Sequence, residues 1–174
     1  MTTRRLAVVT GGTRGIGRAT AARLLADGHD CLLTGTSPDT PPGVPAGAGY
    51  RRLDCADRDD VEAFAAELAE LEPGVLVNNA GINVKGHTAA FRDAYYDRLL
   101  DVNLRAPFAL IRAVLPAMVE AGWGRIVNVT SMWGVSGNPS DAAYCASKAG
   151  LGGLTASVAA EVARLEQLQA VGLG

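Results

Sequence analysis

A glycine-rich segment near the amino terminus limits the folds open to this chain more than any other feature. The sequence TGGTRGIG, residues 10–17, follows the apolar run LAVV and precedes residues with helical spacing. Glycines between a strand and a helix allow a tight turn and let the backbone approach a pyrophosphate. The phosphates can then accept hydrogen bonds from free N–H groups at the helix N-terminus. The segment predicts a dinucleotide-binding unit, the alternative being an ordinary Gly-rich turn.

Apolar runs alternate with helical patterns along the rest of the chain, and each run is continuously apolar, as in strands buried on both faces. We expect strands in residues 4–10, 31–36, 50–55, 74–81 and 124–131, and helices in residues 14–30, 57–71, 90–122 and 143–169. The third helical region should be two helices that meet near Asn103. A Pro- and Gly-rich loop, residues 37–49, replaces a crossover helix, because proline breaks the helical hydrogen-bond ladder. The pattern predicts an α/β fold with a doubly wound parallel sheet (Rossmann-like) of about five strands, in a single dinucleotide-binding domain over residues 1–174.

Composition excludes several classes of function. The net charge is −2 and there is no basic stripe, so neither nucleic acid nor an anionic membrane is expected as a partner. No uninterrupted apolar run approaches the roughly 20 residues that span a bilayer, and the first run is too short for a signal peptide. We therefore expect a cytoplasmic protein. The cysteines, Cys31, Cys55 and Cys145, are scattered and odd in number, which argues against a disulfide framework and against a zinc site.

The glycine spacing is G-x-x-x-G-x-G, and it resembles the TGxxxGxG pattern of the short-chain dehydrogenase/reductase family. NNAG at residues 78–81 matches that family's motif after the fourth strand, and Asp54 matches the aspartate that lies against adenine. The resemblance covers the first half of the chain and implies a nicotinamide cofactor. The cofactor-binding residues that it implies are Gly11, Thr13, Arg14, Gly15, Ile16, Gly17, Thr36, Asp54, Cys55, Asn79, Ala80, Gly81, Tyr144 and Lys148.

The end of the second predicted strand bears on which nicotinamide cofactor is bound. A fold that prefers NAD usually carries an acidic residue there, on the ribose 2′-hydroxyl. Here the strand ends LLTGTS, residues 32–37, with no acidic side chain. Arg14 could hold a 2′-phosphate through charge-assisted hydrogen bonds, and Thr36 could add a hydroxyl donor. We expect NADP(H) rather than NAD(H), the alternative for Arg14 being a solvated loop arginine.

The segment YCASK places Tyr144 and Lys148 four residues apart in a predicted helix, so they share one face about 6 Å apart. An ammonium near a phenol should lower the tyrosine pKa from its reference of about 10. Such a tyrosine can act as general acid or base toward a carbonyl or alcohol oxygen. A surface pair without chemical function is the alternative for the two residues taken alone.

The family resemblance extends to this segment. It implies that Ser131 orients the substrate carbonyl and that Asn103 holds a water in a proton relay, which gives a catalytic set of Asn103, Ser131, Tyr144 and Lys148. The reaction it implies is hydride transfer between nicotinamide and a carbonyl or alcohol substrate. The segments GGTRGIG, GWGRIVNVTS and AAYCASKAG are similar to β-ketoacyl-carrier-protein reductases and other ketoreductases. That similarity implies a small-molecule or acyl-carrier substrate and a homo-oligomer, dimer or tetramer, formed through the two long helices.

The last ten residues, LEQLQAVGLG, depart from the family pattern near Arg164. We expect no useful strand and no Pro-Gly turn there, whereas family members continue with two further strands. The chain would then be short at its C-terminus, and the fifth strand would become an exposed sheet edge. One side of the nicotinamide pocket would lack its wall. The alternative function is therefore a catalytically weak or inactive nucleotide-binding protein that acts as a partner subunit.

Overall fold

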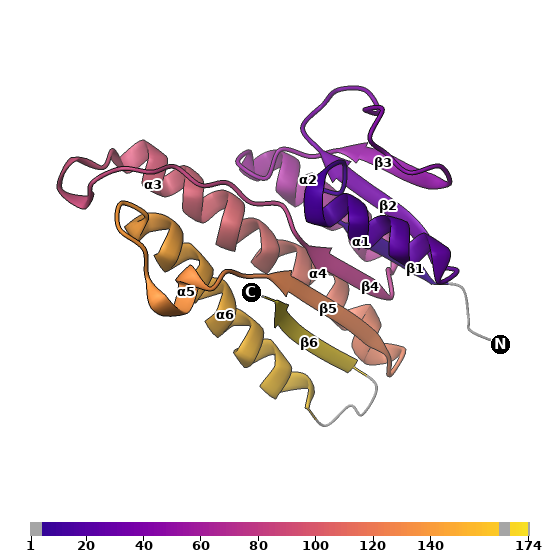
Figure 1. Ribbon diagram of the computed structural model, residues 1–174. Helices are drawn as coiled ribbons and strands as arrows, with labels where there is room; N and C mark the ends of the chain where they lie inside the picture. The colour runs from indigo at the N-terminus through magenta and orange to yellow at the C-terminus, as the bar shows by residue number, and fades with distance from the viewer. Residues whose placement is uncertain (1–4, 164–167, 174) are drawn as a thin grey trace.

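The computed structural model describes residues 5–163 and 168–173, which form one parallel sheet with helices on its two faces (Figure 1). The order of the strands is β3-β2-β1-β4-β5-β6. Their bounds are β1 Leu6–Val9, β2 Asp30–Gly35, β3 Ala48–Arg52, β4 Val75–Asn78, β5 Gly124–Val129 and β6 Leu168–Leu173. The predicted doubly wound, Rossmann-like α/β fold is confirmed.

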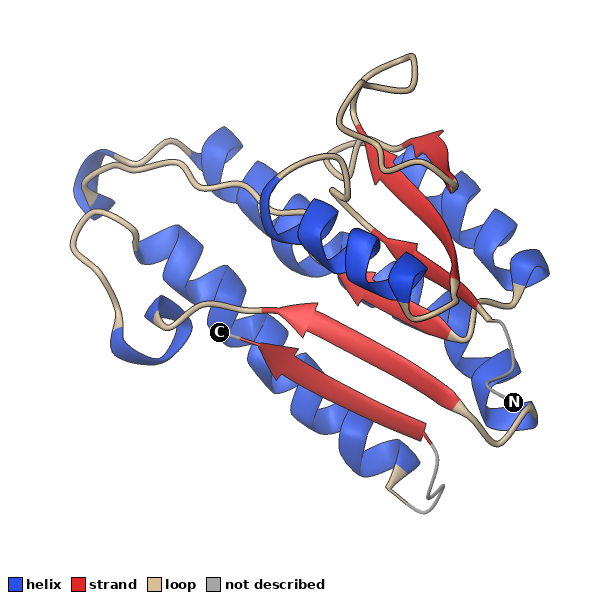
Figure 2. Cartoon of the chain, turned by 45° about the vertical axis from the view of Figure 1, so that its right-hand side comes forward, coloured by secondary structure: helices blue, strands red, loops and turns tan. Residues whose placement is uncertain are grey.

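The helices divide unequally between the two faces of the sheet (Figures 1 and 2). Their bounds are α1 Gly15–Ala26, α2 Arg58–Leu71, η1 Thr88–Ala90, α3 Asp93–Leu100, η2 Asp101–Arg105, α4 Ala106–Glu120, α5 Trp133–Ser136 and α6 Ala142–Val162. Side chains alternate between the faces of a strand. Accordingly Val8 of β1 joins a core with α2, α4 and α6, while Ala7 and Val9 join a smaller core with α1.

The order of the strands reverses between β1 and β4, because the chain first builds outward to β3 and then returns to the other side of β1. In open α/β sheets, ligands bind at such a switch point, outside the carboxyl ends of the strands. The glycine-rich loop follows β1 and the NNAG segment follows β4. Both motifs therefore meet at this point of the fold.

The connection between β2 and β3 contains neither helix nor strand, as its prolines and glycines predict. Two contacts hold it in place, and the second of them is with the glycine-rich loop. Tyr50 Oη donates to Ser37 O at 2.8 Å. Gly43 packs so closely that a Cβ there would lie 2.5 Å from Thr13 O. The loop thus covers the amino end of α1 without a crossover helix.

Asn103 lies within an irregular stretch of a continuous helical segment. The two helices expected to meet near this residue are α3 and α4, and between them η2 has π-helical hydrogen bonding. Single π-helical turns inside α-helices occur frequently at functional sites. The sequence thus located the irregularity correctly, although the helix continues through it.

By length and composition alone, Asp93–Glu120 could cross a membrane, with a mean hydropathy of 1.4 over its most apolar window. Half of that window is buried inside the protein, and α4 supplies much of the core shared with α2. A core helix passes the same test, so one such helix is weak evidence for a membrane span. The cytoplasmic location stays a prediction.

The sixth strand corrects the prediction for the end of the chain. Residues Leu168–Leu173 pair in parallel with the whole of β5, from Gly124 opposite Leu168 to Val129 opposite Leu173. The expectations of no useful strand after residue 164 and of an exposed β5 edge are therefore wrong. The predicted last helix is also too long, since α6 ends at Val162; Arg164 lies outside the described residues. Unpaired backbone groups along β5 favour strand pairing even for a segment of modest β-propensity.

Candidate functional site

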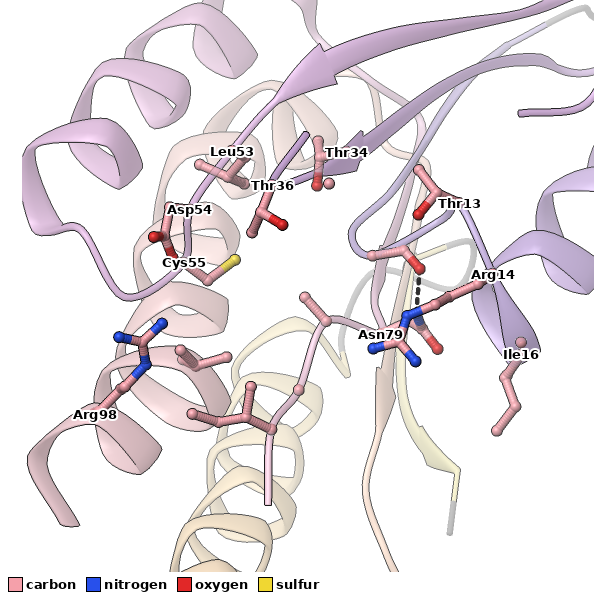
Figure 3. Close-up of a pocket in the computed structure, with 17 residues that line it drawn as sticks. Thr13, Arg14, Ile16, Thr34, Thr36, Leu53, Asp54, Cys55, Asn79 and Arg98 are labelled. Atoms are coloured by element: carbon pink, nitrogen blue, oxygen red, sulfur yellow. Dashed lines mark hydrogen bonds between the residues drawn. The ribbon is translucent and has the colours of Figure 1, made fainter. Parts of the chain in front are cut away.

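A cavity of about 480 Å³ opens at the carboxyl ends of β1, β2, β3 and β4, with its wall shown in Figure 3. Its wall includes every residue predicted to bind cofactor except Gly17, Tyr144 and Lys148. The lining residues are Gly11, Thr13, Arg14, Gly15, Ile16, Thr34, Gly35, Thr36, Leu53, Asp54, Cys55, Asn79, Ala80, Gly81, Ile82, Arg98 and Val102. Sequence reasoning missed six of these. Thr34, Gly35, Leu53, Ile82 and Val102 lie within two residues of predicted ones, whereas Arg98 on α3 carried no recognisable signal.

Close backbone packing explains the spacing of the glycines. Gly11 has a φ of +61°, and a Cβ there would lie 3.0 Å from Ala80 Cα. A Cβ on Gly17 would lie 2.5 Å from Gly11 O and even closer to the Asn79 amide. Gly17 therefore sits behind the cavity and lets α1 approach β4. Asn79 uses that space to donate from Nδ2 to Thr10 O at 2.9 Å and to Gly11 O at 3.0 Å.

The amino end of α1 is suited to a pyrophosphate. The N-cap residue, Arg14, makes no side-chain capping bond, and the first turn contains no acidic residue. Its backbone N–H groups are thus free of a side-chain acceptor and carry the positive end of the helix dipole. Together with the glycine positions that only a hydrogen can occupy, this geometry fits a dinucleotide phosphate group.

One end of the cavity is formed by the turn after β3. Asp60 Oδ2 accepts from Asp54 N at 2.8 Å, and Asp54 Oδ1 accepts from Ala56 N at 2.9 Å. These bonds hold the Asp54 carboxylate at the cavity wall. Burial, with smaller contributions from Asp54 and Asp60, raises the pKa of the Cys55 thiol to about 12. Cys55 is therefore a protonated wall residue and not a nucleophile.

Thr13 and Arg14 lie across the cavity from Asp54, and the end of β2 lines the wall between them, with Thr36 next to Leu53 (Figure 3). Thr34, Gly35 and Thr36 line this part, and the only carboxylate among the lining residues is Asp54 on β3's connection. The acidic side chain typical of an NAD site at the end of β2 is thus missing from the wall, while an exposed guanidinium is present.

A second group of side chains adjoins this cavity at Gly81. A Cβ on Gly81 would lie 3.3 Å from Asn103 Oδ1 and 3.5 Å from Lys148 Nζ. Lys148 is only 5% exposed, and its Nζ donates to Val129 O at 2.7 Å. Burial lowers the pKa of Lys148 from 10.5 to about 8. Lysine is rarely buried without an acidic partner, so this position marks a candidate functional site.

Asn103 is fully buried and fixed by three hydrogen bonds. Its Oδ1 accepts from Ile82 N at 2.9 Å, and its Nδ2 donates to Ile82 O at 2.9 Å and to Ser147 Oγ at 3.0 Å. Ser147 Oγ in turn donates to Tyr144 O at 2.7 Å. Asn103 thus connects the segment after β4 with the helix that carries Tyr144 and Lys148. Sequence reasoning missed Ser147, because its part in this link depends on a contact 44 residues away.

Ser131 lies at the start of the connection from β5 to α6, and Tyr144 is the third residue of α6. The centroid of the Tyr144 ring is 6.0 Å from Lys148 Nζ. Ser131 follows β5 by two residues, and its Oγ accepts from Trp133 N at 3.2 Å. The turn after Ser131 packs directly on α6, since a Cβ on Gly134 would lie 3.0 Å from Ala149 N. The structure therefore brings the four predicted catalytic residues to the same carboxyl edge of the sheet.

A buried carboxylate joins the two loops around this group. Asp141 is fully buried, and its Oδ1 accepts from Asn83 Nδ2 at 3.1 Å. Its other oxygen accepts from Asn138 Nδ2. Gly86 N also donates to Ser140 O at 2.8 Å. The β4–α3 loop is thus tied to the start of α6, three residues before Tyr144.

Comparison with known proteins gives consistent results. A family model described as short chain dehydrogenase matches residues 5–171. Nodulation protein G of Rhizobium sp. (strain N33) is 42% identical over 167 residues, covering 92% of this chain and 68% of that protein. The 3-oxoacyl-(acyl-carrier-protein) reductase FabG of Rickettsia conorii is 35% identical over 165 residues, with the same shares of the two chains. A crystal structure of a metagenomic short-chain oxidoreductase in complex with NADP superposes with a TM-score of 0.85 at 38% identity, covering 97% of this chain and 80% of that one.

Proposed function

The chain belongs to the short-chain dehydrogenase/reductase family, and we propose that it is an NADP(H)-dependent oxidoreductase that interconverts a carbonyl compound and its alcohol. One observation carries the proposal: a buried lysine, with its pKa lowered to about 8, lies beside Tyr144 at the border of a dinucleotide-sized cavity. Burying an ammonium costs stability, and such a cost is typical of a position used for chemistry.

When bound, the nicotinamide cofactor supplies or accepts the hydride. In the direction of reduction, Tyr144 donates its phenolic proton to the carbonyl oxygen, and Ser131 Oγ hydrogen-bonds the same oxygen and orients it. Lys148 donates one ammonium hydrogen bond to Val129 O, and its other N–H groups remain available to the cofactor's ribose. Its positive charge stabilises the phenolate. Asn103 is hydrogen-bonded to both the N–H and the carbonyl of Ile82. These bonds fix the helical turn at which a proton relay to Lys148 would begin.

Three observations support NADP(H) over NAD(H). The end of β2 contributes hydroxyl groups and no carboxylate to the cavity wall, and Arg14 lines the same cavity. An acidic residue there would repel a 2′-phosphate, whereas a guanidinium binds it through paired hydrogen bonds. The structural neighbour described above binds NADP. Arg14→Ala should therefore weaken NADPH about tenfold and leave NADH affinity unchanged.

The substrate class we propose is a β-ketoacyl thioester, on a carrier protein or a smaller thiol. The proposal takes support from the FabG relative, whose name gives that activity. Ketones without the thioester should then be poorer substrates, as measured by kcat/KM.

The deciding experiment combines a fluorescence titration with NADPH and an assay of NADPH oxidation with acetoacetyl-CoA. Tyr144→Phe should bind NADPH normally and lose at least a hundredfold in kcat. Tyr96→Phe, which removes an exposed hydroxyl on α3, is the matched control and should behave as the wild type. Binding without turnover in the wild type would refute the enzyme proposal and favour a nucleotide-binding partner subunit.

We also propose that the protein is a homo-oligomer. Support comes from two exposed apolar side chains on α4, Phe108 at 49% and Val119 at 44% exposure. Sedimentation of the wild type and of Phe108→Glu tests this: the variant should shift toward monomer.

A further inference from the structure

Arg98 differs from Arg58 of α2 and Arg105 of η2 because nothing in the described part of the chain pairs with it. Asp101, three residues further along the helical segment, already binds these two arginines: Arg58 Nη2 at 3.1 Å and Arg105 Nε at 2.8 Å. Arg98 takes no part in that cluster. Its guanidinium instead lines the large cavity. A charged group left unpaired at a cavity wall is available to a ligand.

The part of the cavity that Arg98 faces is not the part suited to phosphate. Figure 3 shows Arg98 on the side of Asp54 and Cys55, across the cavity from Thr13 and Arg14. The glycine-rich loop and the free N–H groups of α1 lie at the Arg14 side. Phosphate binding thus has its own donors, well separated from Arg98.

The wall beside Arg98 suits a flat apolar ring. Leu53 and Cys55 are buried, and Val102 adds a third apolar surface from η2. Cys55 stays uncharged because burial raises the pKa of its thiol to about 12. A planar guanidinium stacks on aromatic rings, whereas an ammonium does not. The wall and Arg98 together therefore form a slot for a purine base.

We propose that the Arg98 guanidinium covers the exposed face of the cofactor's adenine. The inference rests on the proposed binding of a nicotinamide dinucleotide. Because adenine is common to NADPH and NADH, Arg98 should contribute equally to the affinity for both. Arg14, by contrast, should affect NADPH alone. The two arginines thus separate recognition of the base from recognition of the 2′-phosphate.

The test is a fluorescence titration with NADPH and with NADH, together with displacement of NADPH by 5′-AMP. Arg98→Ala should weaken all three ligands by a similar factor, about three- to tenfold. Arg98→Lys should recover only part of the loss, because it restores the charge without the plane. Arg92→Ala, which removes an exposed arginine that packs on Tyr95 outside the cavity, should bind like the wild type. Thermal melting without ligand confirms that each variant is folded.

Four results would overturn the inference. Unchanged affinity in Arg98→Ala shows that the side chain makes no contact, and weakening of NADPH alone assigns it to the 2′-phosphate. Full recovery of affinity in Arg98→Lys shows that Arg98 contributes through its charge alone. In these three cases the wild type still binds NADPH, so the proposed function stands. A wild type that binds neither dinucleotide removes the proposed function and this inference together.

Discussion

Replacing Gly17 by alanine should destabilise the cofactor site through one defined collision. Gly17 is the third residue of α1 and is buried. The added Cβ would lie 2.5 Å from Gly11 O and within the space of the Asn79 amide. That amide now donates two hydrogen bonds, to Thr10 O at 2.9 Å and to Gly11 O at 3.0 Å. Because backbone atoms form the other wall, the Asn79 side chain has to move and loses both bonds.

The size of the effect follows from three contributions. Two lost hydrogen bonds cost about 1 kcal/mol each. Overpacking of a closely packed contact adds about 2 kcal/mol. Alanine regains about 1 kcal/mol through its better helix propensity. The free energy of unfolding of Gly17→Ala should therefore fall by about 3 kcal/mol.

Urea denaturation followed by circular dichroism measures this difference, with Gly153→Ala as the control. Gly153 also lies within a helix, but a Cβ there would meet nothing within 4 Å. It should gain up to about 1 kcal/mol from propensity alone. NADPH should protect the wild type and the control against unfolding much more than Gly17→Ala. Equal stabilities of the two glycine variants would refute the steric reasoning.

Two further predictions concern buried charged groups. Burial lowers the pKa of Lys148 from 10.5 to about 8. Between these two pH values the unfolded chain therefore binds more protons than the folded protein. The free energy of unfolding of the wild type should then increase as pH rises from 8 to 10.5. Lys148→Met should remove this gain and be more stable at pH 7 by at most about 3 kcal/mol; parallel pH profiles of the melting temperature in both proteins would contradict it. Asp141→Ala leaves the amides of Asn83 and Asn138 without their acceptor and should cost about 3 kcal/mol, against less than about 0.5 kcal/mol for Asp39→Ala in the exposed loop. Equal chemical denaturation midpoints for these two variants would show that the buried carboxylate holds nothing in place.

Short-range patterns predicted the parts of the fold that depend on neighbours in sequence. The apolar runs before Thr10 and Asn79 and the glycines of residues 11–17 correctly predicted two strands and the glycine-rich turn, because strand, turn and helix signals there follow one another directly. The prolines of residues 37–49 correctly predicted a connection without a helix, since proline excludes helix whatever surrounds it.

Contacts between distant segments could not be predicted in the same way. Ser147 links to Asn103, 44 residues away, and Asp141 links to Asn83, 58 residues away. The residues next to a serine or an aspartate in sequence do not indicate such a distant hydrogen-bond partner. Arg98 is a similar case. Its lack of an ion-pair partner among the described residues can be recognised only from the side chains that surround it in the folded protein.

The error at β6 has a consequence for the candidate catalytic group. Lys148 is held by the backbone carbonyl of Val129, the last residue of β5, so the position of its ammonium depends on where that strand end lies. An unpaired edge strand frays at its ends. Here Val129 stands opposite Leu173 in the β5–β6 register, one residue beyond Asn128, where the β4–β5 register ends. Pairing with β6 therefore fixes the strand end whose carbonyl orients Lys148. The segment for which the sequence predicted no strand thus supports the proposed catalytic group.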